Sequence, residues 1–248
     1  MTWESDEALA ARLATAAGDI LIDLQARGDR EGKALGAAGD SAANALLCRE
    51  LKAARPADGL LSEEEKDNPS RCAKSRVWIV DPLDGTREYG ERRTDWAVHV
   101  ALAIDGVATV GAVALPGLGI TLTSGAPVPL RLPNSPLKML VSRTRPAAEA
   151  VHVAERLGAD LLPMGSAGAK AMAVVLGNAD IYLHSGGQYE WDNCAPAAVA
   201  QAAGLHVSRA NGSPLHYNNR DPYLPDLLIC RKELAGQVLR LTAEFKAA

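Results

Sequence analysis

The 248-residue chain is 48 % hydrophobic with a formal net charge of −4, so it can bury one large core or two modest ones. The acidic balance argues against a nucleic-acid polymer as partner, and an aromatic content of 4 % is too low for stacking along a single strand. No apolar run reaches the length of a membrane span. An N-terminus unlike a signal peptide and four cysteines without metal-ligand spacing predict a cytoplasmic protein with reduced thiols.

In the first half of the chain, apolar residues at helical spacing predict a helix over residues 4–27. The Gly-rich, charged segment 28–39 is typical of a mobile loop, and a second helix is expected to begin near Asp40. Residues 56–76 look like a further loop. A buried strand at 77–80 is followed by three antiparallel strands with tight turns, at residues 96–104, 107–115 and 119–124.

Four prolines in residues 127–136 predict a linker between an N-terminal half, residues 1–130, and a C-terminal half, residues 131–248. Beyond the linker, strands alternate with helices, which predicts a layered α/β fold with helices covering a sheet. The expected strands lie at 137–141, 161–163, 179–183, 205–208 and 226–230, and the expected helices at 146–157, 167–177, 192–203 and from 233 onward.

The most informative motif follows the strand at 77–80 and reads Asp-Pro-Leu-Asp-Gly-Thr, residues 81–86. Pro82 suits the first position of a helix and Asp81 suits its N-cap, so a helix is expected to begin there. Asp81, Asp84 and the carbonyl of Leu83 offer hard oxygen ligands for divalent cations. The N–H groups of Gly85 and Thr86 would face an anion such as phosphate. The alternative is a capped helix with no further role.

Two other acidic segments are candidates for the same site. The run Glu63-Glu64-Glu65 is either a solvated loop or the source of one more ligand. Asp192 opens an alanine-rich helix, where it is either an N-cap or a metal ligand presented at a helix start.

Asp40 is also expected at the N-cap position of a helix. It would be part of the metal site only if the segment 28–39 closes over the metal. Lys33 on that segment is a candidate for meeting a phosphate, although exposed lysines usually have no specific role. The stretch Gly165-Ser166 with Lys170 lies between a strand and a helix, where its amides can bind part of a ligand or its small residues can simply allow close packing. The five histidines have no metal-ligand spacing and are interpreted as structural.

Together, the motif at 81–86, the pair Trp191-Asp192 and the acidic run Ser62-Glu63-Glu64 resemble the signatures of the inositol monophosphatase superfamily. The continuation Arg87-Glu88-Tyr89 is similar to its CysQ branch, the 3′-phosphoadenosine 5′-phosphate phosphatases. The resemblance implies an αβαβα sandwich like that of the inositol monophosphatases and fructose-1,6-bisphosphatases. It also implies a lithium-sensitive, homodimeric enzyme that requires two or three Mg²⁺ ions.

The resemblance assigns ligand roles residue by residue. One ion would be held by Glu64, Asp81 and the Leu83 carbonyl, and a second by Asp81, Asp84 and Asp192.

The resemblance also assigns roles in catalysis and substrate binding. Thr86, oriented by Asp40, would position a water, while the amides of Gly85 and Thr86 steady the phosphoryl group. Substrate contacts would come from residues at the site and its rim, namely Arg87, Ser166, Lys170 and Asp192, with Lys33 from the loop.

The function implied is hydrolysis of 3′-phosphoadenosine 5′-phosphate to AMP and phosphate in sulfur assimilation, with 3′-phosphoadenylyl sulfate as a further substrate. Its partner is therefore a small phosphorylated molecule. An inositol phosphate or fructose 1,6-bisphosphate phosphatase is the nearest alternative. A catalytically silent binder of metal and phosphate, which regulates a partner, is the alternative from another class.

Overall fold

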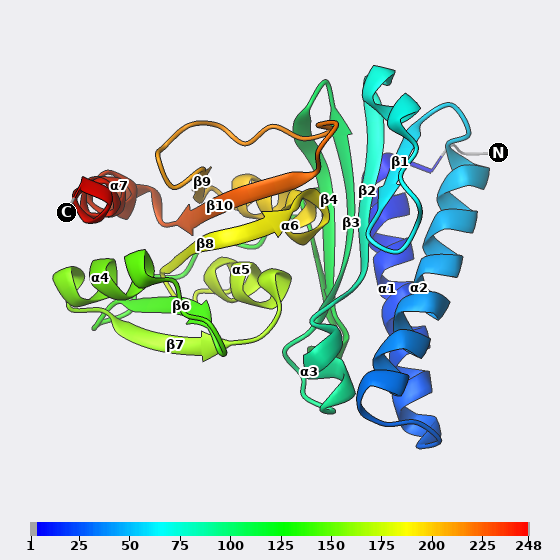
Figure 1. The fold of residues 1–248 in the computed structure, drawn as a ribbon, viewed down its shortest axis with the longest axis horizontal. Helices are drawn as coiled ribbons and strands as arrows, with labels where there is room; N and C mark the ends of the chain where they lie inside the picture. Colours follow the sequence, from blue (N-terminus) through cyan, green and yellow to red (C-terminus); the bar gives the residue numbers. More distant parts are fainter. Residues whose placement is uncertain (1–3, 248) are drawn as a thin grey trace.

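The computed structural model describes residues 4–247, which form five layers of alternating helices and sheets (Figure 1). Helices α1 (Asp6–Arg27) and α2 (Gly32–Ala54) make one outer layer. Helices α5 (Ala167–Val175) and α6 (Glu190–Ala202) lie between the two sheets, and α4 (Ala148–Leu157) and α7 (Lys232–Ala247) cover the other outside. The predicted αβαβα sandwich is confirmed.

The first sheet has the strand order β1-β2-β3-β4-β5. Only β1 and β2 pair in parallel, and the remaining neighbours are antiparallel. Its strands are β1 (Gly59–Ser62), β2 (Arg76–Asp84), β3 (Ala97–Ile104), β4 (Val107–Leu115) and β5 (Ile120–Thr123). Short helices occur beside it at η1 (Pro69–Ala73), α3 (Thr86–Gly90) and η2 (Pro116–Leu118).

The second sheet has the order β7-β6-β8-β10-β9 and mixes parallel with antiparallel pairs. Its strands are β6 (Lys138–Ser142), β7 (Asp160–Met164), β8 (Ile181–Tyr189), β9 (His206–Ser208) and β10 (Tyr223–Cys230). The inner faces of both sheets pack on α5 and α6 in the largest apolar core. The candidate site lies on this inner side.

The segment 28–39, predicted as a mobile loop, is mostly helical, because α2 begins at Gly32. Two of its glycines, Gly36 and Gly39, serve close packing rather than flexibility. A Cβ on Gly36 would lie 2.6 Å from Cγ2 of Thr86, and one on Gly39 would lie 2.9 Å from side-chain atoms of Leu21 and Tyr89. Asp40 is therefore an interior residue of α2 rather than its cap.

The expectation that Asp81 caps a helix beginning at Pro82 is also wrong. Strand β2 continues through the motif to Asp84. The helix begins only at Thr86, after Gly85 turns the chain with a φ of 92°, a conformation that glycine adopts without steric cost. The carboxylates thus lie at the end of a strand and not on a helix.

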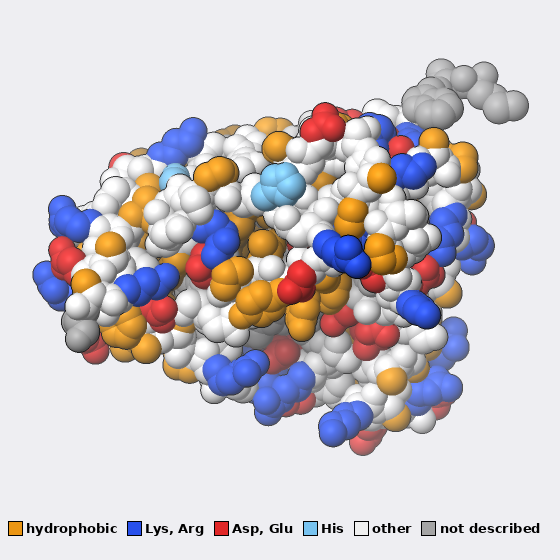
Figure 2. Space-filling model, turned by 45° about the horizontal axis from the view of Figure 1, so that its top comes forward, with side chains coloured by type: hydrophobic (Ala, Val, Ile, Leu, Met, Phe, Trp, Pro, Cys, Tyr) orange, Lys and Arg blue, Asp and Glu red, His pale blue; other side chains and the backbone are white. Residues whose placement is uncertain are grey.

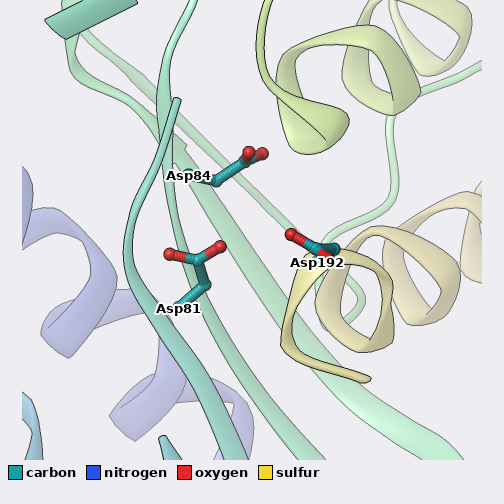
Figure 3. A group of neighbouring side chains, drawn as sticks. All are labelled: Asp81, Asp84 and Asp192. Atoms are coloured by element: carbon teal, nitrogen blue, oxygen red, sulfur yellow. The ribbon is translucent and has the colours of Figure 1, made fainter. Parts of the chain in front are cut away.

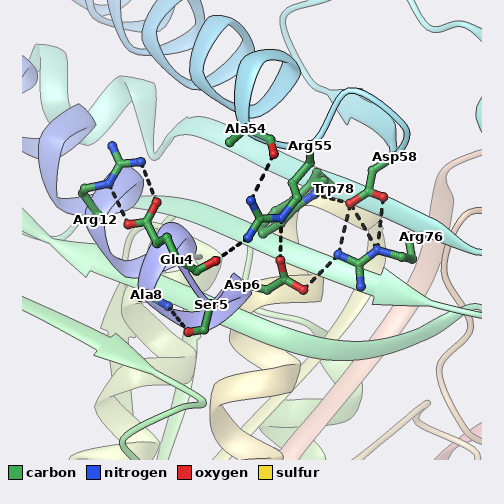
Figure 4. Close-up of polar contacts among 10 residues, drawn as sticks. All are labelled: Glu4, Ser5, Asp6, Ala8, Arg12, Ala54, Arg55, Asp58, Arg76 and Trp78. Carbon is green, nitrogen blue, oxygen red and sulfur yellow. Dashed lines mark hydrogen bonds and ion pairs between the residues drawn. The ribbon is translucent and has the colours of Figure 1, made fainter. Parts of the chain in front are cut away.

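A cluster of ion pairs joins the start of α1 to the end of α2 and to β2 (Figure 4). Asp6 accepts hydrogen bonds from Arg55 and Arg76, each at 2.8 Å. Asp58 pairs with Arg76 and also accepts from the indole N–H of Trp78 at 2.9 Å. These contacts tie the outer helices to the sheet at the end away from the motif.

Candidate metal centre and substrate site

Three aspartates converge on the inner side of the first sheet (Figure 3). Asp81 and Asp84 lie on β2 and Asp192 lies in the first turn of α6, and one carboxylate oxygen of each falls within 4.8 Å of the others. Among the described residues this is the group of carboxylates that could hold a metal ion. Hard oxygen donors at this spacing suit Mg²⁺ or a similar cation.

A β-bulge places Asp81 and Asp84 together. Residues three apart on a regular strand point to opposite faces of a sheet. The pairing of β2 with β3 shifts register between Asp81, which pairs with His99, and Asp84, which pairs with Ala97. The bulge changes the direction in which one of the two side chains points, so that both carboxylates lie on the same side of the sheet.

Asp84 is held by the start of α5. Its Oδ2 accepts hydrogen bonds from Oγ of Ser166 at 2.5 Å and N–H of Gly168 at 2.6 Å, and its Oδ1 accepts from N–H of Ala167 at 3.1 Å. Burial alone would raise the pKa of Asp84, but His99 and these donors outweigh it and lower the pKa to about 2. These donors favour the ionised form of Asp84 and fix the position of its carboxylate.

His99 links the two segments that carry the aspartates. Its ring is fully buried. Nδ1 donates to the carbonyl of Trp191 at 2.9 Å, and Nε2 lies 3.2 Å from Oδ2 of Asp84. Burial opposes the charged imidazolium, but the Asp84 carboxylate outweighs it and raises the pKa of His99. Helix α5 packs so closely here that a Cβ on Gly168 would lie 2.0 Å from the His99 ring.

Asp81 and Asp192 have fewer compensating groups than Asp84. Asp81 accepts N–H of Leu83 at 3.0 Å, and Asp192 accepts N–H of Tyr189 at 2.6 Å. Burial and repulsion from neighbouring carboxylates raise the pKa of Asp81 well above its usual range, and burial together with Asp84 raises that of Asp192 to about 6. Such crowding of like charge is what a bound cation relieves.

The structure brings Glu63 rather than Glu64 to this cluster. Glu63 interacts with Asp81, and burial together with Asp192 raises its pKa to about 7. β1 ends at Ser62, and Glu63 lies in the turn that follows, where its N–H donates to the Val80 carbonyl at 3.4 Å. The charge of Glu64 acts instead on Asp40.

Thr86 connects the motif to α2. Its hydroxyl donates to the Leu83 carbonyl at 3.1 Å and also lies 3.5 Å from Oδ1 of Asp40. Burial and the charge of Glu64 raise the pKa of Asp40 to about 7. The predicted proximity of Asp40 and Thr86 is therefore present, although Asp40 comes from inside a helix.

Asp192 lies within the helix rather than at its cap, since α6 begins at Glu190. Glu190 is fully buried and accepts hydrogen bonds from the backbone N–H groups of Asn218 and Asn219, both at 2.7 Å. The start of α6 is thereby anchored to the loop that precedes β10.

Lys170 lies beneath the Gly165-Ser166 loop and is only 5 % exposed. Its ammonium donates to the carbonyls of Gly165 at 3.0 Å and Ser166 at 2.7 Å, and it lies 5.3 Å from the centre of the Tyr182 ring. Burial lowers the pKa of Lys170, against the opposing effect of Asp84. In this position Lys170 supports the loop and does not project into solvent.

A cavity of about 610 Å³ adjoins Asp40 and Thr86. Two exposed cations, Lys33 at the start of α2 and Arg87 on α3, contribute to its lining, and Arg87 pairs with Glu91 at 2.9 Å. The structure thus groups the predicted residues Lys33, Asp40, Thr86 and Arg87 around one cavity.

Sequence reasoning missed His99 and chose Glu64 over Glu63. For His99, the available signal was strand alternation. His99 lies on the same face of β3 as Ala97 and Ala101, which pack in the inner core. A polar residue at the centre of an otherwise apolar strand can mark the face on which a site lies.

The match to known proteins agrees with this geometry. The sequence model of the inositol monophosphatase family matches residues 3–246. The chain belongs to this family. The resemblance drawn from the three motifs is confirmed, and so, at the level of the family, is the prediction of a phosphoric monoester hydrolase.

Individual relatives cover nearly the whole chain. The 3′-phosphoadenosine 5′-phosphate phosphatase of Mycobacterium leprae is 50 % identical, over 97 % of this chain and 94 % of the relative. The crystal structure of CysQ from Bacteroides thetaiotaomicron, 24 % identical, superposes with a TM-score of 0.80 over 93 % of this chain and 98 % of that one. A staphylococcal inositol monophosphatase with 2′AMP bound, 19 % identical, has a TM-score of 0.75 over 96 % and 97 % of the two chains. Within residues 4–247, no helix is both long and apolar enough to cross a bilayer.

Proposed function

We propose that the chain is a Mg²⁺-dependent phosphatase that hydrolyses 3′-phosphoadenosine 5′-phosphate to AMP and phosphate. The observation that carries the proposal is the trio Asp81, Asp84 and Asp192, whose oxygens crowd within 4.8 Å. The substrate follows from the M. leprae phosphatase, half of whose residues are shared over almost the entire length.

The donor set fits two or three Mg²⁺ ions. Asp81, Asp84 and Asp192 supply carboxylates, and Leu83 supplies a carbonyl oxygen. We replace Glu64 with Glu63 as the fourth acidic ligand, because Glu63 is the glutamate that faces Asp81. All these donors are oxygens, as Mg²⁺ prefers. When bound, the ions neutralise phosphoryl charge and lower the pKa of a water at the site.

The protein's own groups orient the reaction. The Thr86 hydroxyl, placed between the Leu83 carbonyl and Asp40, positions the attacking water. The N–H groups of Gly85 and Thr86 hold the phosphoryl oxygens, since preorganised donors stabilise charge that develops in the transition state.

Further groups at the rim contact the rest of the substrate. Lys33 and Arg87, in the lining of the 610 Å³ cavity, contribute positive charge for the second phosphate. Ser166 reaches the substrate from the start of α5, beside Asp84. Lys170 is a positioning residue for this loop, because its ammonium is bound to the loop's own carbonyls.

Phosphate release by the purified full chain tests the proposal. We expect release from 3′-phosphoadenosine 5′-phosphate that requires Mg²⁺, stops with EDTA, recovers on addition of Mg²⁺ and is inhibited by Li⁺. The panel includes 3′-phosphoadenylyl sulfate, inositol 1-phosphate and fructose 1,6-bisphosphate, compared by kcat/KM. A higher kcat/KM for inositol 1-phosphate or fructose 1,6-bisphosphate than for 3′-phosphoadenosine 5′-phosphate would favour the alternative, an inositol phosphate or fructose 1,6-bisphosphate phosphatase. No release from any substrate would favour a silent metal and phosphate binder. Homodimerisation and cytoplasmic localisation stay predictions.

A further inference from the structure

An aromatic cluster lies beside the candidate metal centre. The rings of Tyr189 and Trp191 stack with centres 4.8 Å apart and planes 9° from parallel. Tyr223 meets Tyr189 edge-on, with centres 6.0 Å apart. The whole sequence contains four Trp, five Tyr and one Phe, so three of ten aromatic residues gather at this one place.

Two rings of this cluster remain exposed to solvent. Tyr189 is 45 % exposed and Tyr223 is 46 % exposed, whereas the other three tyrosines, Tyr89, Tyr182 and Tyr217, are buried in the cores. Figure 2 shows hydrophobic side chains gathered in the middle of one face of the molecule, next to a hollow. Trp191 packs against the largest apolar core, but core packing does not explain why Tyr189 and Tyr223 stay nearly half exposed.

The cluster is attached to the metal centre through the backbone. Tyr189 donates its N–H to the Asp192 carboxylate at 2.6 Å, and Trp191 precedes Asp192 directly. Tyr223 pairs with Tyr189 across strands β10 and β8. Gly187 also lets the Tyr223 ring approach β8, because a Cβ there would lie 2.7 Å from that ring. The backbone that carries Tyr189 and Trp191 is therefore fixed to the Asp192 carboxylate, and β10 and Gly187 hold the Tyr223 ring against β8.

We propose that Tyr189 and Tyr223, backed by Trp191, form a stacking surface for the purine base of the substrate. This inference rests on the proposed function and names the part of the site that selects a nucleotide. The phosphates of such a substrate would be held by the cations that the aspartates bind and by Lys33 and Arg87, whereas its base is neutral and planar and gains from an aromatic face. A polyol such as inositol has no planar face and gains nothing comparable there.

The sharpest test compares two substrates that differ only in the base: 3′-phosphoadenosine 5′-phosphate and the base-free 1-deoxyribose 3,5-bisphosphate. The Tyr189→Leu and Tyr223→Leu variants should lower kcat/KM for the first by roughly tenfold to a hundredfold, mainly through KM. For the base-free substrate, the fold-decrease in kcat/KM should be at least five times smaller. Tyr189→Phe and Tyr223→Phe should keep most of the preference for the base, because they keep the ring.

A matched control is Leu132→Ala, which removes an 87 % exposed side chain outside the cluster and should leave the ratio of the two substrates unchanged. Calorimetric binding of AMP with Mg²⁺ present should weaken in the Leu variants to a similar degree. Equal losses on both substrates, or no loss in AMP affinity, would overturn the stacking surface. If the unmutated chain releases no phosphate from either substrate, the proposed function fails, and the AMP measurement still decides whether the rings bind a base.

Discussion

Two groups of carboxylates in this protein have opposite surroundings. Asp6 and Asp58 face the guanidinium groups of Arg55 and Arg76 (Figure 4). Burial opposes the ionised form of Asp6, but hydrogen bonds from Arg76 and Arg55 outweigh it and lower the pKa of Asp6. Its charge is fully matched within the protein.

Asp81 and Asp192, by contrast, face other acids, and their pKa values are raised. A carboxylate with a raised pKa costs folding free energy when ionised, and one with a lowered pKa contributes it. The first group is therefore built for stability. The second group carries a repulsion between carboxylates that a bound metal ion or a proton relieves, which is typical of a binding site.

The largest effect should come from Asp81→Asn. Activity should fall at least about 100-fold, because the variant removes a charge shared by the proposed metal ions. In EDTA its melting temperature should equal or exceed that of the parent, because the repulsion is relieved. Phosphate release measures the activity, and thermal unfolding with and without Mg²⁺ measures the melting temperature. Mg²⁺ should raise the melting temperature of the parent but not that of the variant. A melting temperature of the variant in EDTA far below that of the parent would contradict the repulsion between the carboxylates.

The choice between the two glutamates is the next test. Glu63→Gln should lower activity, or raise the Mg²⁺ concentration for half-maximal activity, by about 10- to 100-fold, as expected for a residue at a metal site. Glu64→Gln is the matched control, one residue away in the same turn, and should change the activity or the Mg²⁺ requirement by less than about threefold, within the scatter of surface substitutions. A reversed order would restore Glu64 as the ligand.

His99→Leu should have a smaller effect. It removes the contacts to Trp191 and Asp84, so both ligand-bearing segments lose a common support. We expect about a tenfold higher Mg²⁺ requirement with a smaller change in kcat at saturating Mg²⁺. His99→Asn keeps a donor for the Trp191 carbonyl and should recover part of the loss. A purely structural role would lower the melting temperature without moving the Mg²⁺ requirement.

The smallest effect on activity is expected for Asp6→Asn, in the matched group. Unfolding free energy should fall by about 1–2 kcal/mol, which is about 2–8 °C for a chain of this size, while kcat/KM stays within twofold. Because the pKa of Asp6 is lowered by folding, this contribution is present above the unfolded pKa near 4. It should be lost as the pH falls through the lowered pKa of Asp6 in the folded state. Denaturant unfolding of parent and variant at pH 7 and pH 3 checks the sign.

Sequence periodicity predicted most elements, because buried faces of helices and strands repeat at fixed spacings. It failed over residues 28–39, because residues 32–39 form the first turns of α2. Glycine and small residues there read as a loop, but Gly36 and Gly39 are needed because Thr86, Leu21 and Tyr89 lie so close. That requirement depends on partners remote in the chain and is invisible to local propensity.

The sequence by itself determined the chemistry of this protein: its family motifs, and the acidic residues Asp81, Asp84 and Asp192 that could serve as ligands. These are properties of residue types at short spacing. Only the tertiary structure decided that Glu63 and not Glu64 faces Asp81, that His99 supports Asp84, and that Lys170 is buried. The physical reason is that a side chain's face depends on strand register and on one β-bulge, both of which are set by contacts between distant segments.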